Sequence, residues 1–466
     1  MHAITHTFAH SAVVLLLSIA AIRPAIAEPL PTDDGYRGLW YMNQPTGDEY
    51  HYKYSGGMAT YPQQHVPIAV YSPDARKTFF VYGGTLEGKR ELLHMVSYYD
   101  HETGTVPKPR VLLNKQTGDA HDNPTLQIDR DGHLWIFSSA HGTARPSYIH
   151  RSTKPYSIDE FERIVETNFS YTQPWYLPTH GFLFLHTRYA DGRGLFWMTS
   201  RDGRDWSKPS PLAKIEKGDY QISWAIGDRV ATAFDYHPNP VGLNARTNIY
   251  YLETTDAGRT WRNAAGDTVH VPLDQAKNPA LVHDYKAEGL LVYLKDLQFD
   301  ADGHPVILYL TSRGFEPGPE HGPHVWHTAR WTGTGWTLRP AMKSDHNYDH
   351  GSFYIEPDGT WRLIAPTDPG PQPFGTGGEM VMWTSNDEGT TWQRAKTLTA
   401  GSPRNHTYAR RPVNAHPDFY ALWADGDAFG PSKSRLYFAD KEGTVRVLPA
   451  TMSGDVATPE VVPAGE

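Results

Sequence analysis

Two segments of the chain, TTDAGRTW (Thr254–Trp261) and SNDEGTTW (Ser385–Trp392), decide the fold. Both fit the pattern S/T-x-D-x-G-x-T-W, and SRDGRDW (Ser200–Trp206) is a version one residue shorter. In such a segment the aspartate caps its own turn, the glycine takes a positive φ, and the tryptophan packs beneath the turn. This Asp-box pattern is typical of the hairpin between the outer strands of a propeller blade. We therefore interpret all three segments as structural.

A second repeat consists of a turn followed by a strand of alternating aromatic and aliphatic residues. It begins at seven positions, spaced roughly 45 to 75 residues apart, which suits four strands per blade: Ser72, Asp129, His180, Gly227, Asp300, Glu356 and His416. The sequence therefore predicts an all-β fold, a seven-bladed β-propeller with Asp-box turns. No Pro/Gly linker divides the chain, so we expect one catalytic propeller domain over residues 28–466, with two stacked β domains as the alternative.

The N-terminal residues resemble a secretory signal. Ser11–Ile22 is an apolar run too short to span a bilayer, and Ala25-Ile26-Ala27 fits an A-x-A cleavage site. We expect a signal peptide over residues 1–27 and a secreted or periplasmic protein, with a membrane anchor as the alternative. No later segment could cross a membrane.

Composition excludes several classes of function. The formal net charge of -9 argues against a nucleic-acid partner, which requires a basic face. The chain contains no cysteine, so thiolate catalysis, disulfides and Cys-based zinc sites are excluded. We expect a monomer with no nucleic-acid or membrane partner. An anionic sugar remains compatible, because a site can be locally basic on an acidic protein.

Histidine, tyrosine and arginine side chains recur near the ends of three successive repeats. His121, in GDAHDNP, and His141, in SSAHG, bracket one inner strand and could share a pocket. Tyr171 and Arg188 occupy comparable places in the next repeat. Tyr236 and His237 end the strand after that. The structural alternative is that Tyr171 packs and Arg188 pairs with a surface acid. These residues include no carboxylate pair, which argues against ordinary glycoside hydrolysis.

Two later segments offer further candidates, KSDHNYDHGS with His346 and NHTYARRPVNAHPD with His406, Arg410 and Arg411. Adjacent residues on a strand point to opposite faces, so one of the two arginines could bind a sulfate or carboxylate. The alternative is a surface salt bridge. Another segment, GPEHGPHVWH, carries three histidines, but their spacing fits no defined zinc motif. We therefore assign no metal ligands.

These segments give the chain a family resemblance. It is similar to the BNR-repeat propellers that include the ulvan lyases of polysaccharide lyase families 24 and 25, the second being the closer. The resemblance rests on HDNP followed by a second histidine, YTQPWY, HTRY, TAFDYHP, SDHNYD, GTGGE and NHTYARRPVNAHPDFYALWADG. These strings span nearly the whole mature chain and are far more specific than Asp-boxes.

The resemblance implies β-elimination at a uronate in ulvan or a related sulfated rhamnose polysaccharide. An arginine neutralises the uronate carboxylate, a base removes the C5 proton, and an acid protonates the departing O4. Arg188 is the expected neutraliser, with Tyr171 or His121 as base and acid and His141 and Tyr236 orienting them. Tyr189 competes for the role of Tyr171. No cofactor is required. The expected substrate-binding residues are Asn123, Tyr189, His237, His346, His406, Arg410 and Arg411.

Two other functions remain open from the sequence. One is an Asp-box glycoside hydrolase of the sialidase kind, although GYRGLWYM (Gly35–Met42) lacks the F/Y-R-I-P motif of that family. The other is a carbohydrate-binding propeller without catalysis. Only a lyase would create an unsaturated uronate that absorbs in the ultraviolet.

Overall fold

The computed structural model describes residues 29–189 and 192–463, and the predicted signal peptide, residues 1–27, lies outside them. Regular structure in these ranges consists of β-strands and three short 3₁₀ helices, Ala120–Asp122, Gly242–Ala245 and Pro319–His321. Within these ranges, no helix is long and apolar enough to cross a membrane.

Seven sheets of four or more strands follow one another along the described chain. The first contains β3 (Ala69–Ser72), β4 (Lys77–Gly84), β5 (Leu93–Asp100) and β7 (Arg110–Asn114). The second contains β8 (Pro124–Ile128), β9 (Leu134–Ser138), β10 (Ser147–Ser152) and β11 (Phe161–Thr167). The third contains β12 (Ser170–Leu177), β13 (Gly181–Tyr189), β14 (Arg193–Ser200) and β15 (Ser210–Ala213).

The fourth sheet contains β16 (Gln221–Ile226), β17 (Arg229–Tyr236), β18 (Thr247–Thr254), β19 (Trp261–Arg262), β20 (Thr268–Val269) and β21 (Leu281–His283). The fifth contains β22 (Leu291–Phe299), β23 (Pro305–Ser312), β24 (His324–Trp331) and β25 (Trp336–Ser344). The sixth contains β26 (Ser352–Ile355), β27 (Trp361–Asp368), β28 (Glu379–Ser385) and β29 (Gln393–Thr397). The seventh contains β30 (Asn405–Arg410), β31 (Ala421–Gly426), β33 (Leu436–Ala439), β34 (Val445–Val447) and β36 (Glu460–Val461).

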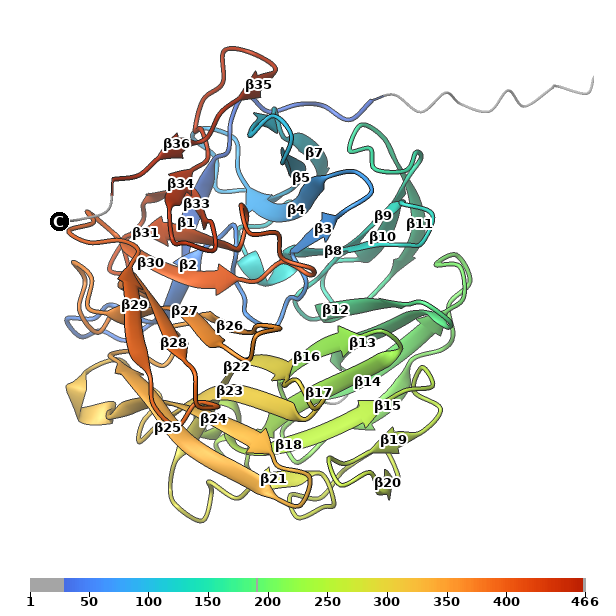
Figure 1. Ribbon diagram of the computed structural model, residues 1–466, viewed down its shortest axis with the longest axis vertical. Helices are drawn as coiled ribbons and strands as arrows, with labels where there is room; N and C mark the ends of the chain where they lie inside the picture. The colour runs from blue at the N-terminus through green and yellow to red at the C-terminus, as the bar shows by residue number, and fades with distance from the viewer. Residues whose placement is uncertain (1–28, 190–191, 464–466) are drawn as a thin grey trace, which may run out of the picture.

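The sheets radiate from a common centre, and the last lies beside the first (Figure 1). A parallel bridge between Val70 and Val413 joins these two sheets. The N-terminal hairpin of β1 (Gly38–Pro45) and β2 (Tyr52–Gly57) pairs with β32 (Lys433–Ser434) near the C-terminus. A small sheet of β6 (Val106–Pro107) and β35 (Val456–Ala457) adds a further link. The prediction of an all-β propeller fold is confirmed.

The Asp-box turns form as their residue types require. In the first quoted segment, the Asp256 carboxylate accepts the Thr260 N–H at 2.9 Å and the Thr260 hydroxyl at 2.7 Å. Gly258 has φ +83°, and Trp261 is 2% exposed. In the second segment, Asp387 accepts the Thr391 N–H at 2.8 Å in the same way. These carboxylates hold backbone turns, which agrees with their interpretation as structural.

Antiparallel pairing divides the loops between two ends of the molecule. Successive connections in an antiparallel sheet alternate between its ends. The Asp-box turns join third to fourth strands, so they share one end with the connections from first to second strands. The connections from second to third strands, and the segments entering each inner strand, therefore meet at the opposite end. We call these the Asp-box end and the loop end.

Candidate active site

The candidate site is assembled at the loop end of neighbouring sheets. Segments that enter an inner strand and connections between second and third strands supply its polar side chains. In chain order these are Asp119 and His121 before β8, His141 between β9 and β10, Tyr189 and Arg193 at the turn between β13 and β14, Tyr220 before β16, and Arg246 between β17 and β18. A short 3₁₀ helix, Ala120–Asp122, presents His121, and Asp119 caps that helix by accepting the His121 N–H.

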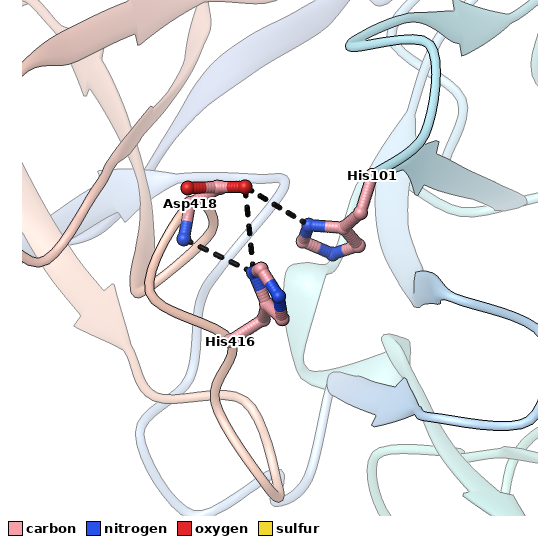
Figure 2. A group of neighbouring side chains, drawn as sticks. All are labelled: His101, His416 and Asp418. Atoms are coloured by element: carbon pink, nitrogen blue, oxygen red, sulfur yellow. Dashed lines mark hydrogen bonds and ion pairs between the residues drawn. The ribbon is translucent and has the colours of Figure 1, made fainter.

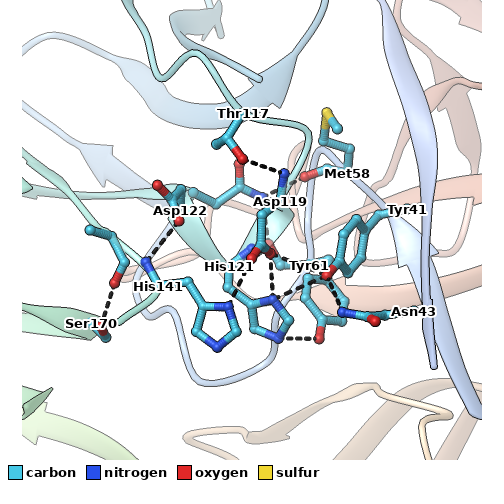
Figure 3. Close-up of polar contacts among 12 residues, drawn as sticks. Tyr41, Asn43, Met58, Tyr61, Thr117, Asp119, His121, Asp122, His141 and Ser170 are labelled. Atoms are coloured by element: carbon cyan, nitrogen blue, oxygen red, sulfur yellow. Dashed lines mark hydrogen bonds and ion pairs between the residues drawn. The ribbon is translucent and has the colours of Figure 1, made fainter. Parts of the chain in front are cut away.

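One carboxylate holds both predicted histidines. Asp119 Oδ1 lies 2.6 Å from His121 Nδ1, and Asp119 Oδ2 lies 2.8 Å from His141 Nδ1 (Figure 3). The two imidazoles stack with ring centroids 4.1 Å apart. Burial acts to raise the pKa of Asp119, but the hydrogen bonds from the two histidines outweigh it and lower that pKa. An ionised carboxylate only accepts hydrogen bonds, so both Nδ1 atoms carry the proton, and Nε2 is the basic atom of each ring in its neutral form.

The two histidines differ in their surroundings. The His121 side chain is 6% exposed, and its Nε2 accepts from the Tyr61 hydroxyl at 2.7 Å. Burial lowers the pKa of His121, against the opposing effect of Asp119, so this ring is neutral at pH 7. The His141 side chain is 28% exposed, and its N–H donates to Asp122 Oδ1 at 2.7 Å. Two neighbouring acids thus fix the ring and the backbone of His141, which is the more accessible of the pair.

A group of phenols and a guanidinium lies beside His141. The rings of His141 and Tyr189 are 5.9 Å apart between centroids. Half-buried Arg193 donates from Nε to the Tyr189 hydroxyl at 3.3 Å, and its guanidinium lies 4.7 Å from the Tyr220 ring centroid. Tyr220 contacts the Tyr171 hydroxyl at 3.2 Å. Imidazole, phenol and guanidinium groups from neighbouring sheets therefore lie in contact with one another at the loop end.

A small cavity lies beside these groups, and Tyr171 and Tyr220 form part of its lining. A second guanidinium, that of buried Arg246, faces it and donates from Nη2 to the Tyr348 hydroxyl at 2.7 Å. The cavity is lined by Tyr54, Tyr61, Pro62, Gln64, His121, Tyr171, Tyr220, Leu243, Arg246, Tyr348, His350 and Tyr408. None of these lining residues of the described chain is Asp or Glu. The pocket thus offers cations, phenols and imidazoles to a ligand, and aromatic walls suit a sugar ring.

The structure brings several of the predicted residues together. His121, His141 and Tyr171 meet with ring centroids 4.1 to 6.2 Å apart. Tyr189 joins them through His141, and His237 packs against Tyr220 at 5.0 Å. Whether each acts in catalysis or binding stays a prediction.

Two predicted placements need correction, and both follow from strand alternation. Neighbouring residues on a strand point to opposite faces. Tyr189 faces His141, so Arg188 points the other way, where its charge acts on buried His186. Likewise His237 faces Tyr220, while Tyr236 packs in the apolar core with its ring 6.1 Å from that of Tyr250. The guanidinium of Arg246 lines the cavity, and that of Arg193 lies beside Tyr189 and Tyr220.

Other predicted binding residues hold backbone instead of facing the cavity. Asn123 donates from Nδ2 to the carbonyls of Met58 and Tyr61. Arg410, 3% exposed, donates to the carbonyls of Thr60, Pro62, Gln63 and His65. The two side chains fix the backbone of the segment that carries Tyr61, so they stabilise one wall of the cavity. Both terminal nitrogens of Arg410 thus have carbonyl partners inside the protein.

The remaining candidates also have partners inside the protein. Arg411 pairs with Asp296 at 3.1 Å and lies over the Trp224 ring at 3.4 Å from its centroid. His406 accepts from the Trp423 indole at 3.0 Å. Buried His346 accepts the Tyr348 N–H at 3.0 Å and so helps to set the segment that carries Tyr348.

Five site residues were missed by sequence reasoning: Tyr61, Asp119, Arg193, Tyr220 and Arg246. The sequence did indicate Asp119, because an acidic residue two positions before His121 can orient the imidazole ring of that histidine. Arg193 also lay four residues from Tyr189. Tyr61, Tyr220 and Arg246 come from loops whose positions depend on how the blades meet, which the local sequence does not encode.

Fold and site together define an all-β propeller whose loop end carries an acid-clamped histidine pair beside tyrosines and arginines. A family model described as a BNR repeat-containing family member matches residues 89–344, more than half of the chain. The chain therefore belongs to the BNR repeat-containing family.

Curated relatives extend over more of the chain. An ulvan lyase of Alteromonas sp. (strain LOR) is 22% identical over 398 residues, covering 75% of this chain and 79% of that protein. The PL25 ulvan lyase of Pseudoalteromonas sp. (strain PLSV) is 22% identical over 405 residues, covering 77% and 80%.

Two solved structures share the fold. A PL25 ulvan lyase bound to -[GlcA(1-4)Rha3S]- superposes with a TM-score of 0.69 at 19% identity, covering 83% of this chain and 94% of that one. Another PL25 ulvan lyase structure gives a TM-score of 0.70 at 18% identity, with coverage of 89% and 97%.

Proposed function

We propose that this protein is a secreted polysaccharide lyase that cleaves ulvan, or a closely related sulfated rhamnose–uronate polysaccharide, by β-elimination. Two relatives over three quarters of the chain carry the name ulvan lyase. A structure that shares the fold is described as bound to a glucuronate–sulfated rhamnose unit. The chemistry of the pocket supports the same reaction.

The first requirement of elimination is to neutralise the uronate carboxylate. The C5 proton is a poor acid, because its removal places more negative charge beside that carboxylate. A guanidinium stabilises the developing charge through two parallel hydrogen bonds. Arg193 is half-buried and reaches Tyr189 and Tyr220, so it is the arginine best placed to bind the carboxylate. Arg246 contributes a second positive charge from the cavity wall.

The second requirement is a base for the C5 proton. His141 suits this role because Asp119 holds its protonated Nδ1 at 2.8 Å, so that Nε2 is the basic atom of the neutral ring, and the ring is accessible. His121 also has an unprotonated Nε2, but that atom is occupied by the Tyr61 hydroxyl at 2.7 Å. We therefore assign the base to His141, with His121 and Tyr61 positioning the pair.

The third requirement is an acid for the leaving oxygen. Burial raises the pKa of Tyr189, against the opposing charge of Arg193, so its phenol stays protonated at neutral pH. A tyrosine base would instead need a lowered pKa, and burial raises the pKa of Tyr171 well above its usual value. In the reaction His141 takes the C5 proton, the C4=C5 bond forms, the C4–O4 bond breaks, and O4 takes the Tyr189 proton. Exchange with solvent then restores both groups.

The proposal rests on one observation: Asp119 accepts hydrogen bonds from two imidazoles, which lie next to Arg193 and Tyr189. A hydrolase of the usual kind needs two carboxyl groups across the scissile bond. Asp119 is already engaged by both histidines, and the described lining of the cavity adds no acid.

The direct test is incubation of the purified protein with ulvan, other uronate polysaccharides and neutral glycans, followed by ultraviolet absorbance. The proposal expects absorbance from an unsaturated uronate with ulvan and none with neutral glycans. Release of reducing ends without absorbance would indicate hydrolysis, and binding without either product would indicate a lectin-like propeller. Secretion is tested by recovery of a shortened chain, starting near Glu28, from the periplasm or medium.

A further inference from the structure

A second cluster of histidines and an aspartate lies at the Asp-box end, where the ring of sheets closes. His101 directly follows β5 of the first sheet. His416 and Asp418 lie in the connection between β30 and β31 of the last sheet. Figure 2 shows the three side chains pointing toward one another from these two parts of the chain. None of them belongs to the candidate active site.

The geometry leaves a gap between the three groups. Asp418 Oδ2 lies 3.8 Å from His101 Nδ1 and 3.6 Å from His416 Nδ1, too far for direct hydrogen bonds. The ligand atoms of all three residues lie within 4.8 Å of one another. Ligands about 2.0 to 2.1 Å from a tetrahedral Zn²⁺ are separated by roughly 3.4 Å. The two Asp418–imidazole distances therefore lie within a few tenths of an ångström of the spacing around a tetrahedral ion.

His101 provides an independent reason to expect a ligand. Its side chain is 5% exposed, yet Nδ1 has no hydrogen-bond partner, an arrangement that is costly for a buried polar atom. Its other nitrogen, Nε2, lies 2.8 Å from the Thr78 hydroxyl. An Nε2–H donated to Thr78 leaves the Nδ1 lone pair aimed at Asp418, as in the outer-shell contacts of zinc-bound histidines.

We propose that His101, His416 and Asp418 form a Zn²⁺ site that ties the first sheet to the last. Two imidazoles and one carboxylate suit zinc, whereas Ca²⁺ and Mg²⁺ prefer oxygen ligands throughout. Asp418 is 59% exposed, so water can complete a tetrahedron. Zinc at His416 Nδ1 replaces the long hydrogen bond that this atom accepts from the Asp418 N–H at 3.2 Å.

The site is structural, because its ligands come from the segments that close the ring. Backbone hydrogen bonds already join them: the Tyr71 N–H donates to the Val413 carbonyl, and the Val413 N–H donates to the Ala69 carbonyl, both at 2.9 Å. An ion between His101 and the 416–418 segment would add a cross-link that exists only in the folded chain. Zinc should therefore raise thermal stability.

The test is thermal unfolding of the full-length chelator-treated protein, with ZnCl₂ added in steps. Wild type is expected to show a rising midpoint that saturates at one zinc per chain. Asp418→Asn and His416→Gln are expected to fold but to lose this rise. The matched control is Asp302→Asn, in the similar cluster Asp300, Asp302 and His304, and it should respond like wild type. His141→Gln, at the active site, should also respond like wild type.

The outcomes separate clearly. A zinc-dependent rise that disappears only in the Asp418 and His416 variants supports the site. No rise in wild type, or an equal rise in both variants, would overturn it. Neither result depends on the proposed lyase activity, because the readout is stability in the absence of any polysaccharide.

Discussion

Two clusters with the same composition, one aspartate and two histidines, lie at opposite ends of this molecule. They differ in the distance between the carboxylate oxygens and the imidazole nitrogens. At the loop end, Asp119 uses one oxygen for each imidazole, at 2.6 and 2.8 Å. At the Asp-box end, a single oxygen of Asp418 faces both imidazoles at 3.6 and 3.8 Å. The ring pairs are almost equally close, 4.1 and 4.0 Å between centroids.

The difference of about 1 Å separates two kinds of chemistry. Hydrogen-bond contact with a carboxylate fixes a proton on Nδ1 and makes Nε2 the basic atom of the neutral ring, which suits proton transfer. A wider gap with an unpaired buried Nδ1 suits a metal ion. Residue composition alone therefore does not define a site, and the position of the carboxylate relative to the rings does.

The largest effect is expected at the loop-end pair. His141→Ala should lower kcat/KM for ulvan cleavage by about 10²–10⁴-fold, because it removes the base. His416→Ala, in the other cluster, should keep the wild-type rate at room temperature. The rates are measured by ultraviolet absorbance of the unsaturated product. Equal losses in the two variants would remove the functional distinction between the clusters.

The arginine assignment gives the next effect. Arg193→Ala should lower kcat by about 10²–10³-fold, since the uronate carboxylate loses its neutralising partner. Arg193→Lys should recover part of the rate, because it restores charge without the bidentate geometry. Arg188→Ala is the matched control and should act like wild type. Loss of activity in Arg188→Ala together with a normal Arg193→Ala would restore the sequence-based choice.

Substitution of Arg410 distinguishes a structural role behind the pocket from a role in ligand binding. Arg410→Gln should lower the free energy of unfolding by about 2–4 kcal/mol, because buried carbonyls lose charged donors. Arg404→Gln, where a half-buried arginine donates to the Lys433 carbonyl, should cost less than about 1 kcal/mol. Urea unfolding measures both. A stable Arg410→Gln with weakened ulvan binding would instead indicate a sulfate contact.

The smallest effect is a change in acid stability at the Asp-box end. With zinc chelated, folded His101 has a pKa of about 4 against an ordinary 6.5. As the pH falls below 6.5, the unfolded chain binds a proton that the folded chain refuses, so stability falls until about pH 4. His101→Gln should reduce this slope by as much as about 1.4 kcal/mol per pH unit, one proton's worth. Unfolding midpoints across that range measure it, and an unchanged slope would contradict a neutral buried His101.

The fold could be predicted from the sequence because its signals are local. An Asp-box contains its own carboxylate acceptor, its positive-φ glycine and its tryptophan, so its turn forms from adjacent residues, as at Asp256 and Trp261. The repeated turn and its strand of alternating aromatic and aliphatic residues are likewise local patterns. The number and spacing of repeats then led to the propeller.

The site was only partly predictable, because it depends on contacts between blades. His121 and His141 lie at the two ends of one hairpin, β8 and β9, so their meeting followed from a single sheet. Arg188 and Tyr236 were misplaced because the sequence does not show which strand face meets the pocket. Arg410 looked like an anion site, but the carbonyls that occupy it come from residues about 350 positions away. Long-range contacts of this kind cannot be read from neighbouring residues.

The central claim is that one ionised carboxylate sets the protonation of both imidazoles. It is tested most directly by Asp119→Asn, compared with wild type for the rate of unsaturated product formation from ulvan. The account predicts a folded protein whose rate falls by about 10²-fold or more, because an amide no longer holds Nδ1–H on both rings. A folded Asp119→Asn protein that cleaves ulvan at the wild-type rate would contradict it.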